Sequence, residues 1–334
     1  MMKLERLFTV VDSHTEGEPT RVVIGGGTKI PGKTMAEKRD YFRENLDHIR
    51  RMLVQEPRGH ADMFVAFLVP PTTDEADVGV LFMNPIGYRD MCGHATIGVT
   101  TVVIETGMVT VKEPTTEVKL DTPAGLVRAR ANIIDGLVDS VTFTNVSSFF
   151  VGEYSIEAPE LGNIKVDVAF GGNFFIFVSE EEMGVRVDKE NVDELITKGR
   201  AVVNAAEKQI KVHHPNPSIA PSVRAVMIYG PPTNPKASGK NIVITRFSFD
   251  RSPCGTGTCA RMATLYAKRK LKLNEEFIHE SILGSLFKGR LIQETKVGEY
   301  TAVIPEVTGS AYISGFNTIV SCVNDPFKNG FSIK

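Results

Sequence analysis

Tryptophan is absent from this chain, and cysteine occurs at only four of its 334 positions. So few cysteines cannot form the disulfide framework of a small secreted domain. Cys92, Cys254, Cys259 and Cys322 include no CxxC pair, and the histidines show no metal-ligand spacing. We therefore expect reduced thiols and no bound metal.

The chain also lacks charge blocks and long apolar runs. Its formal net charge is −2, from 38 basic and 40 acidic residues, so no excess of one sign indicates a nucleic-acid partner. No apolar run approaches the roughly 20 residues of a membrane span. The first residues, MMKLERLFTVVDSH, lack the small-residue cleavage site of a signal peptide. These absences predict a cytoplasmic protein with no nucleic-acid partner and no membrane partner.

What is present is a strand-rich pattern with few helices. Alternating apolar residues on both sides of Asp135-Gly136 predict a β-hairpin. Helical patterns run from residue 35 to about 54 and from 190 to 210. No GxGxxG follows a strand, and no P-loop occurs. This order predicts an α+β protein rather than a doubly wound sheet, and the length is sufficient for two domains.

Two stretches place a Cys-Gly pair between a turn and a helix-length segment: RDMCGHATIG and RSPCGTGTCA. Their cysteines, Cys92 and Cys254, are 254 − 92 = 162 residues apart, about half the chain, which indicates an internal repeat. The segment after Cys254 has the apolar spacing of an amphipathic helix. The segment after Cys92 is rich in β-branched residues, so a helix there requires burial to override local propensity.

A cysteine at a helix N-terminus has a distinctive chemistry. The unpaired N–H groups there favour the thiolate and can hold a carboxylate, and a following glycine lets a ligand approach the backbone. Two such cysteines fit the inversion of an amino-acid α-carbon, which needs a base on one face and an acid on the other. A buried cysteine is more commonly a core residue, so a structural role for Cys92 and Cys254 stays open on this reasoning alone.

Seven blocks together resemble the proline racemase family, which includes 4-hydroxyproline 2-epimerases and trans-3-hydroxyproline dehydratases. They span nearly the whole chain in the family's order: DSHTEGEPTRVV, EPRGHADMF, DMCGHATIG, FGGNFF, DRSPCGTGT, ESILGSLFKG and TGSAYISGFN. The resemblance implies an α+β fold like that of diaminopimelate epimerase, with two pseudo-symmetric lobes, each a strand-rich barrel around a central helix. We expect the first lobe, with Cys92, to comprise residues 1–125 and 310–334, the second, with Cys254, to comprise 126–309, and the substrate cleft to lie between them.

The resemblance also implies roles for individual residues. Cys92 and Cys254 match the family's two acid/base cysteines. The matching substrate-binding residues are Gly93, His94, Gly255 and Thr256 near the carboxylate, Asp250 with His94 near the ring nitrogen, and Phe64 in the ring pocket. No cofactor and no metal are implied, and a homodimer is expected.

The expected activity is the interconversion of L- and D-proline, with 4-hydroxyproline as a further substrate. The dehydratase branch generally lacks the second cysteine, so Cys254 argues against it. Action on both rings is suggested because Ile244, with Arg246 or Ser248 nearby, could admit a ring hydroxyl. A 4-hydroxyproline 2-epimerase is the main competing hypothesis, since that branch of the family also keeps both cysteines. Two further hypotheses are a thiol redox protein and a non-catalytic sensor of imino acids.

Overall fold

The structure is a computed structural model that describes residues 3–27, 29–216, 219 and 221–333. The chain divides into two compact units, one of residues 1–143 with 309–334 and the other of residues 144–308. The boundary expected from the sequence lies between residues 125 and 126. The division falls later because the strands after that point continue to pair within the first unit.

Most strands of the first unit precede residue 145, and one further strand comes from the C-terminal end of the chain. Its elements are β1 (Leu4–Thr15), β2 (Glu18–Gly25), α1 (Met35–Asn45), α2 (Asp47–Val54), β3 (Val65–Val69), β4 (Val78–Asn84), β5 (Gly87–Arg89), α3 (Gly93–Glu105), β6 (Thr115–Thr122), β7 (Gly125–Ile134), β8 (Leu137–Thr144) and β18 (Ala311–Cys322). Strand β18 pairs antiparallel with β1, and the hairpin predicted at Asp135-Gly136 joins β7 to β8.

The second unit has a similar composition of elements. They are β9 (Ser148–Ala158), β10 (Gly162–Phe170), β11 (Phe174–Ser179), α4 (Glu180–Met183), the 3₁₀-helix η1 (Lys189–Asn191), α5 (Val192–Gln209), β12 (Val223–Gly230), β13 (Gly239–Thr245), β14 (Phe249–Asp250), α6 (Gly255–Ala267), β15 (Glu276–Glu280), β16 (Leu286–Val297) and β17 (Tyr300–Gly309). The predicted helix over residues 190–210 is confirmed as α5.

The two units repeat one order of elements. In the first, β3 pairs with β4, β4 with β5, and β6 returns parallel to β4; in the second, β12, β13, β14 and β15 do the same. The registers also correspond, since Gly79 lies opposite Asp121 in one unit and Lys240 opposite Glu280 in the other. The internal repeat that the two Cys-Gly pairs indicated is therefore a repeat of whole supersecondary units.

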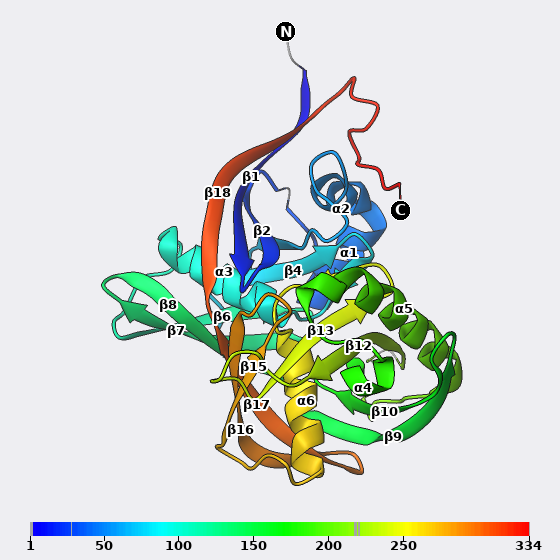
Figure 1. Cartoon of the computed structure of the whole chain (residues 1–334). Helices are drawn as coiled ribbons and strands as arrows, with labels where there is room; N and C mark the ends of the chain where they lie inside the picture. Colours follow the sequence, from blue (N-terminus) through cyan, green and yellow to red (C-terminus); the bar gives the residue numbers. More distant parts are fainter. Residues whose placement is uncertain (1–2, 28, 217–218, 220, 334) are drawn as a thin grey trace. The chain divides into compact units, whose positions relative to one another are not determined.

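Each unit has one helix buried among its strands (Figure 1). Every residue of α3 from Gly93 to Ile104 is buried, and the helix contacts β1, β2, β3, β7 and β18. Helix α6 contacts β9, β10, β11 and β16. Burial on all sides explains why the β-branched sequence of α3 is helical, and the α+β architecture of strands around a central helix is confirmed.

One predicted helix is wrong. The pattern from residue 35 to about 54 forms two helices, α1 and α2, because the backbone leaves helical geometry at Leu46, where φ is −125° and ψ is 12°. Asp47 then begins α2 and forms an ion pair with Arg50 at 2.6 Å. Among the described residues, none of the helices combines the length and apolarity that a membrane crossing requires.

Candidate active site

Cys92 occupies the N-cap of the buried helix α3, as the sequence predicted. Its backbone is extended, with φ of −147° and ψ of 123°. Its Sγ lies 3.3 Å from Nδ1 of His94 in the first turn of the helix. A thiol and an imidazole at this distance can share a proton, so the pair is suited to acid/base chemistry.

Thr15 and Phe64 contact the backbone and the ring of His94, respectively. Thr15 Oγ1 donates a hydrogen bond of 2.8 Å to the His94 carbonyl oxygen. Phe64 lies edge-to-face against the imidazole, with ring centroids 4.8 Å apart. The first unit thus brings together Phe64, Cys92, Gly93 and His94, four of the residues that the resemblance singled out.

Cys254 occupies the N-cap of the second buried helix, α6, and its backbone differs from that of Cys92. Its φ is 64° and its ψ is 104°, a region that residues other than glycine rarely adopt. A Cβ built on Gly257 would lie 3.0 Å from Cys254 Sγ, so the sulfur lies over the first turn of α6. Gly255 and Thr256 form that turn. Strained non-glycine backbone of this kind is concentrated at functional sites.

Asp250 is linked to Cys254 through Ser252. The Oδ1 atom of Asp250 accepts hydrogen bonds from Ser252 N at 2.9 Å and from Ser252 Oγ at 2.8 Å. Ser252 Oγ in turn accepts a 3.1 Å hydrogen bond from Cys254 N. The second unit therefore brings Asp250, Cys254, Gly255 and Thr256 together, and Ser252 is a site residue that the sequence analysis missed.

Two glycines let α6 approach the turn between β10 and β11. A Cβ on Gly171 would lie 2.3 Å from Thr256 O and 2.6 Å from Ala260 N, both backbone atoms of the helix. Gly172 has φ of 107° and faces the Thr256 side chain. The Gly-Gly pair of the FGGNFF block thus sets the position of the first turn of α6.

The remaining cysteines lie in structural surroundings. Cys259 is fully buried in α6, and burial raises the pKa of its thiol well above the ordinary value. Cys322 ends strand β18. Neither cysteine caps a helix N-terminus, and we assign structural roles to both.

The structure does not support a role for Ile244 in admitting a ring hydroxyl to the substrate pocket. Val243 shares a cluster of buried residues with Cys254, whereas Ile244 belongs to the core against α5, where a Cβ on Gly199 would lie 2.6 Å from its Cδ1. Successive residues of a strand face opposite sides of the sheet, so Ile244 faces away from Cys254. Arg246 likewise pairs with Glu207 on α5, and Ser248 bonds Thr245.

The described residues also bear on metal binding. They contain no group of three or more His, Cys, Asp or Glu side chains placed to hold a metal ion. His14 and Glu16, two residues apart in β1 and the turn after it, make other contacts: His14 Nδ1 accepts a hydrogen bond from Gly17 N, and Glu16 Oε1 accepts one from Ser310 N.

Comparisons with known proteins give a consistent result. Residues 10–332 match the family model described as proline racemase. The chain is 47% identical over 335 residues to a proline racemase of Acetoanaerobium sticklandii, covering 99% of this chain and 100% of the relative. It is 44% identical over 331 residues to a 4-hydroxyproline 2-epimerase of Streptosporangium roseum, covering 99% of each. The crystal structure of a hydroxyproline epimerase from Agrobacterium vitis with bound trans-4-hydroxy-L-proline is similar over 99% of this chain and 97% of that one, with a TM-score of 0.90 and 35% identity.

Proposed function

The chain belongs to the proline racemase family and is an isomerase of the racemase and epimerase class, and on this premise we propose that it interconverts L- and D-proline with Cys92 and Cys254 as the two acid/base groups. The observation that carries the proposal is the repeated placement of a Cys-Gly pair at the N-terminus of a buried 13-residue helix, once in each unit.

The proposed reaction is a pair of proton transfers at one α-carbon. One cysteine, as the thiolate, removes the α-proton, so that an S–H bond forms as the Cα–H bond breaks. The electron pair stays on the substrate and is delocalised into its carboxylate. The other cysteine, as the thiol, gives its proton to the opposite face of the carbon. Protons and electrons balance without a cofactor, and the two sulfurs exchange roles after each turnover.

The other residues of the two clusters have matching roles in this proposal. Backbone N–H groups at Gly93, Gly255 and Thr256 bind the substrate carboxylate and stabilise the charge that develops on it. Asp250, with His94, holds the ring ammonium. Phe64 lines the apolar part of the ring.

4-Hydroxyproline is the second substrate that we propose, by epimerisation at C2. The chain is 44% identical to the S. roseum 4-hydroxyproline 2-epimerase, close to the 47% that it shares with the A. sticklandii proline racemase. These identities support 4-hydroxyproline and proline about equally as substrates. An enzyme acting mainly on 4-hydroxyproline is therefore the second candidate. A cytoplasmic location and a homodimer complete the proposal, and light scattering on the purified protein tests the homodimer.

Deuterium labelling tests the two-base mechanism. In D₂O, the D-proline first formed from L-proline should carry deuterium at the α-carbon, while the recovered L-proline should not, because different sulfurs remove and return the proton. Equal early labelling of both enantiomers would indicate a single base. Chiral chromatography with L-proline and with cis- and trans-4-hydroxyproline measures the substrate preference.

Substitution of either N-cap cysteine tests the assignment of residues. Cys92→Ala and Cys254→Ala should each reduce racemisation by at least about 10²- to 10⁴-fold, the usual contribution of a positioned proton donor or acceptor. Cys322→Ala is the matched control and should keep nearly full activity. Full activity in both N-cap variants would contradict the mechanism.

A further inference from the structure

The two N-cap cysteines differ in one respect that the repeat makes plain. Cys92 has an ordinary extended backbone, whereas Cys254 has a left-handed φ of 64°. Such a conformation persists only when the surrounding structure holds it. The residues around Cys254 therefore have to supply contacts that those around Cys92 do not need.

Those contacts converge on the carbonyl oxygen of Pro253, the residue before the cysteine. It accepts a 3.0 Å hydrogen bond from Thr258 Oγ1 and a 3.2 Å hydrogen bond from Asn241 Nδ2. Both side chains are fully buried. With both lone pairs of the oxygen used, the peptide between Pro253 and Cys254 cannot rotate without breaking two buried hydrogen bonds.

Each donor is itself anchored. The single hydroxyl proton of Thr258 goes to Pro253, so the 2.8 Å contact between Thr258 Oγ1 and His279 Nδ1 requires that the imidazole be the donor. Burial, with the nearby Arg261 guanidinium, lowers the pKa of His279 to about 3. The ring is therefore neutral at physiological pH, and its proton lies on Nδ1.

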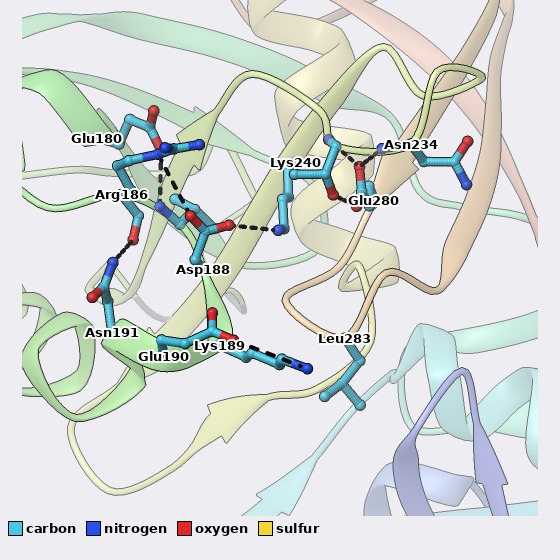
Figure 2. A network of polar contacts seen from close by, with 12 residues as sticks. Glu180, Arg186, Asp188, Lys189, Glu190, Asn191, Asn234, Lys240, Glu280 and Leu283 are labelled. Carbon is cyan, nitrogen blue, oxygen red and sulfur yellow. Dashed lines mark hydrogen bonds and ion pairs between the residues drawn. The ribbon is translucent and has the colours of Figure 1, made fainter.

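Asn241 is anchored through Glu280. Its Nδ2 also donates to the Glu280 carbonyl oxygen at 3.2 Å. The Glu280 carboxylate accepts hydrogen bonds from the backbone N–H groups of Thr233 and Asn234, and Lys240, its partner across the strands, pairs with Asp188 (Figure 2). The strand pair that carries Asn241 is thus held at the Lys240–Glu280 position next to this residue.

The first unit lacks the corresponding polar groups. The registers that align Gly79 and Asp121 with Lys240 and Glu280 place Val80 at the position of Asn241 and Leu120 at the position of His279. Both are fully buried. Thr96 corresponds to Thr258, four residues after the cysteine, but its Oγ1 has no hydrogen-bond partner among the described residues. Of these two equivalent positions in the described part of the chain, the one beside the strained cysteine is the one with the polar anchorage.

We propose that Asn241, Thr258 and His279, here called the Pro253 clamp, are positioning residues that hold Cys254 in its left-handed conformation and keep its sulfur over the first turn of α6. The clamp touches neither substrate nor reacting atoms. This inference rests on the proposed function, because a displaced Cys254 sulfur would misalign the proton transfer. A misplacement of about 1 Å can lower the rate roughly 10²-fold.

The test compares two equivalent threonines. Thr258→Val removes the hydroxyl with little change in volume and should lower kcat about 10- to 100-fold while KM stays within about 3-fold, because the carboxylate-binding N–H groups remain. Thr96→Val makes the same change beside Cys92 and should keep kcat within about 2-fold. Thr258→Ser retains the hydroxyl and should recover most of the activity. Equal kcat values for Thr258→Val and Thr96→Val, or no recovery in Thr258→Ser, would overturn the clamp.

A second measurement separates the clamp from the proposed reaction. Alkylation of Cys254 and of Cys92 by iodoacetamide, followed by mass spectrometry of the peptides, needs no substrate. In Thr258→Val the rate at Cys254 should fall several-fold relative to Cys92, because the sulfur leaves the N–H groups that favour the thiolate. Thr96→Val should leave the ratio unchanged. An unchanged ratio in Thr258→Val refutes the clamp, whereas loss of the proposed function alone would appear as a wild-type protein that racemises neither ring.

Discussion

Individual residues in this protein take their roles from the face of the strand on which they lie. Val243 and Ile244 are neighbours in β13, but one packs in the cluster around Cys254 and the other in the core against α5. The sequence pattern suggested a role for Ile244 in substrate choice because it shows only position along the chain. Which side of the sheet the side chain faces depends on the register of β13, and this is a property of the assembled unit.

Ile244→Phe should therefore change stability and not substrate choice. Gly199 already approaches Ile244 closely, and overpacking of a core typically costs about 1–3 kcal/mol. Urea unfolding should show this loss, with the proline to 4-hydroxyproline preference unchanged. Ile244→Val is the control and should cost about 0.5–1.5 kcal/mol. A reversed substrate preference in a stable Ile244→Phe protein would show that Ile244 lines the substrate pocket after all.

His279 gives the stability a pH dependence of known sign. The unfolded chain binds a proton at the ordinary pKa of 6.5, whereas the folded state resists protonation down to about 3. Stability from this residue is present above pH 6.5 and is lost as the pH falls, with a slope of at most about 1.4 kcal/mol per pH unit.

Unfolding free energies at pH 7.5 and pH 5 check this expectation. His279→Asn places an amide nitrogen near the position of Nδ1 and does not titrate, so its stability should fall less between the two pH values than that of the wild type. Identical differences for the two proteins would show that His279 is not the source of the pH dependence.

At the scale of elements, the buried helix α6 depends on a glycine that lets two backbones approach each other. This glycine is Gly171, and the atoms that an added Cβ would meet belong to the backbone of α6 and cannot move aside as a flexible side chain can. The position of that helix also sets the position of Cys254 at its N-terminus. Packing and site geometry are therefore determined by the same contact.

Gly171→Ala should destabilise the protein by about 1–3 kcal/mol or more and should lower kcat, because α6 must shift. Gly239→Ala is the matched control, since a Cβ there meets nothing closer than 3.9 Å and should cost no more than about 0.5 kcal/mol. Thermal unfolding and the racemisation assay together measure both effects. Full stability of Gly171→Ala would mean that the helix tolerates the displacement.

At the scale of the whole molecule, the chain carries one supersecondary arrangement twice, with one N-cap cysteine in each copy. The same tripeptide opens the loop after β3 and the loop after β12: Pro70-Pro71-Thr72 and Pro231-Pro232-Thr233. In both loops a buried carboxylate accepts hydrogen bonds from the threonine, Asp121 in one unit and Glu280 in the other. This second echo was readable in the sequence, with an offset of 233 − 72 = 161 residues, one less than that of the two cysteines.

Substrate protection tests the proposal at this scale. If both cysteines act on one α-carbon, proline should slow the alkylation of Cys92 and of Cys254 with the same concentration dependence, although they belong to different units. Cys322 should be alkylated at the same rate with and without proline. Two distinct midpoints for Cys92 and Cys254 would mean that they do not serve one substrate.

The sequence by itself determined the α+β class, the hairpin at Asp135-Gly136, the two Cys-Gly pairs and the family, because each of these depends on local pattern or on ordered motifs along the chain. The tertiary structure alone decided that the β-branched segment after Cys92 is a helix, that Ile244 faces the core, and that Asn241 and Thr258 meet at one carbonyl oxygen, with His279 bonded to Thr258. These outcomes depend on burial, strand register and backbone strain. Such quantities arise only when residues far apart in the chain are packed together.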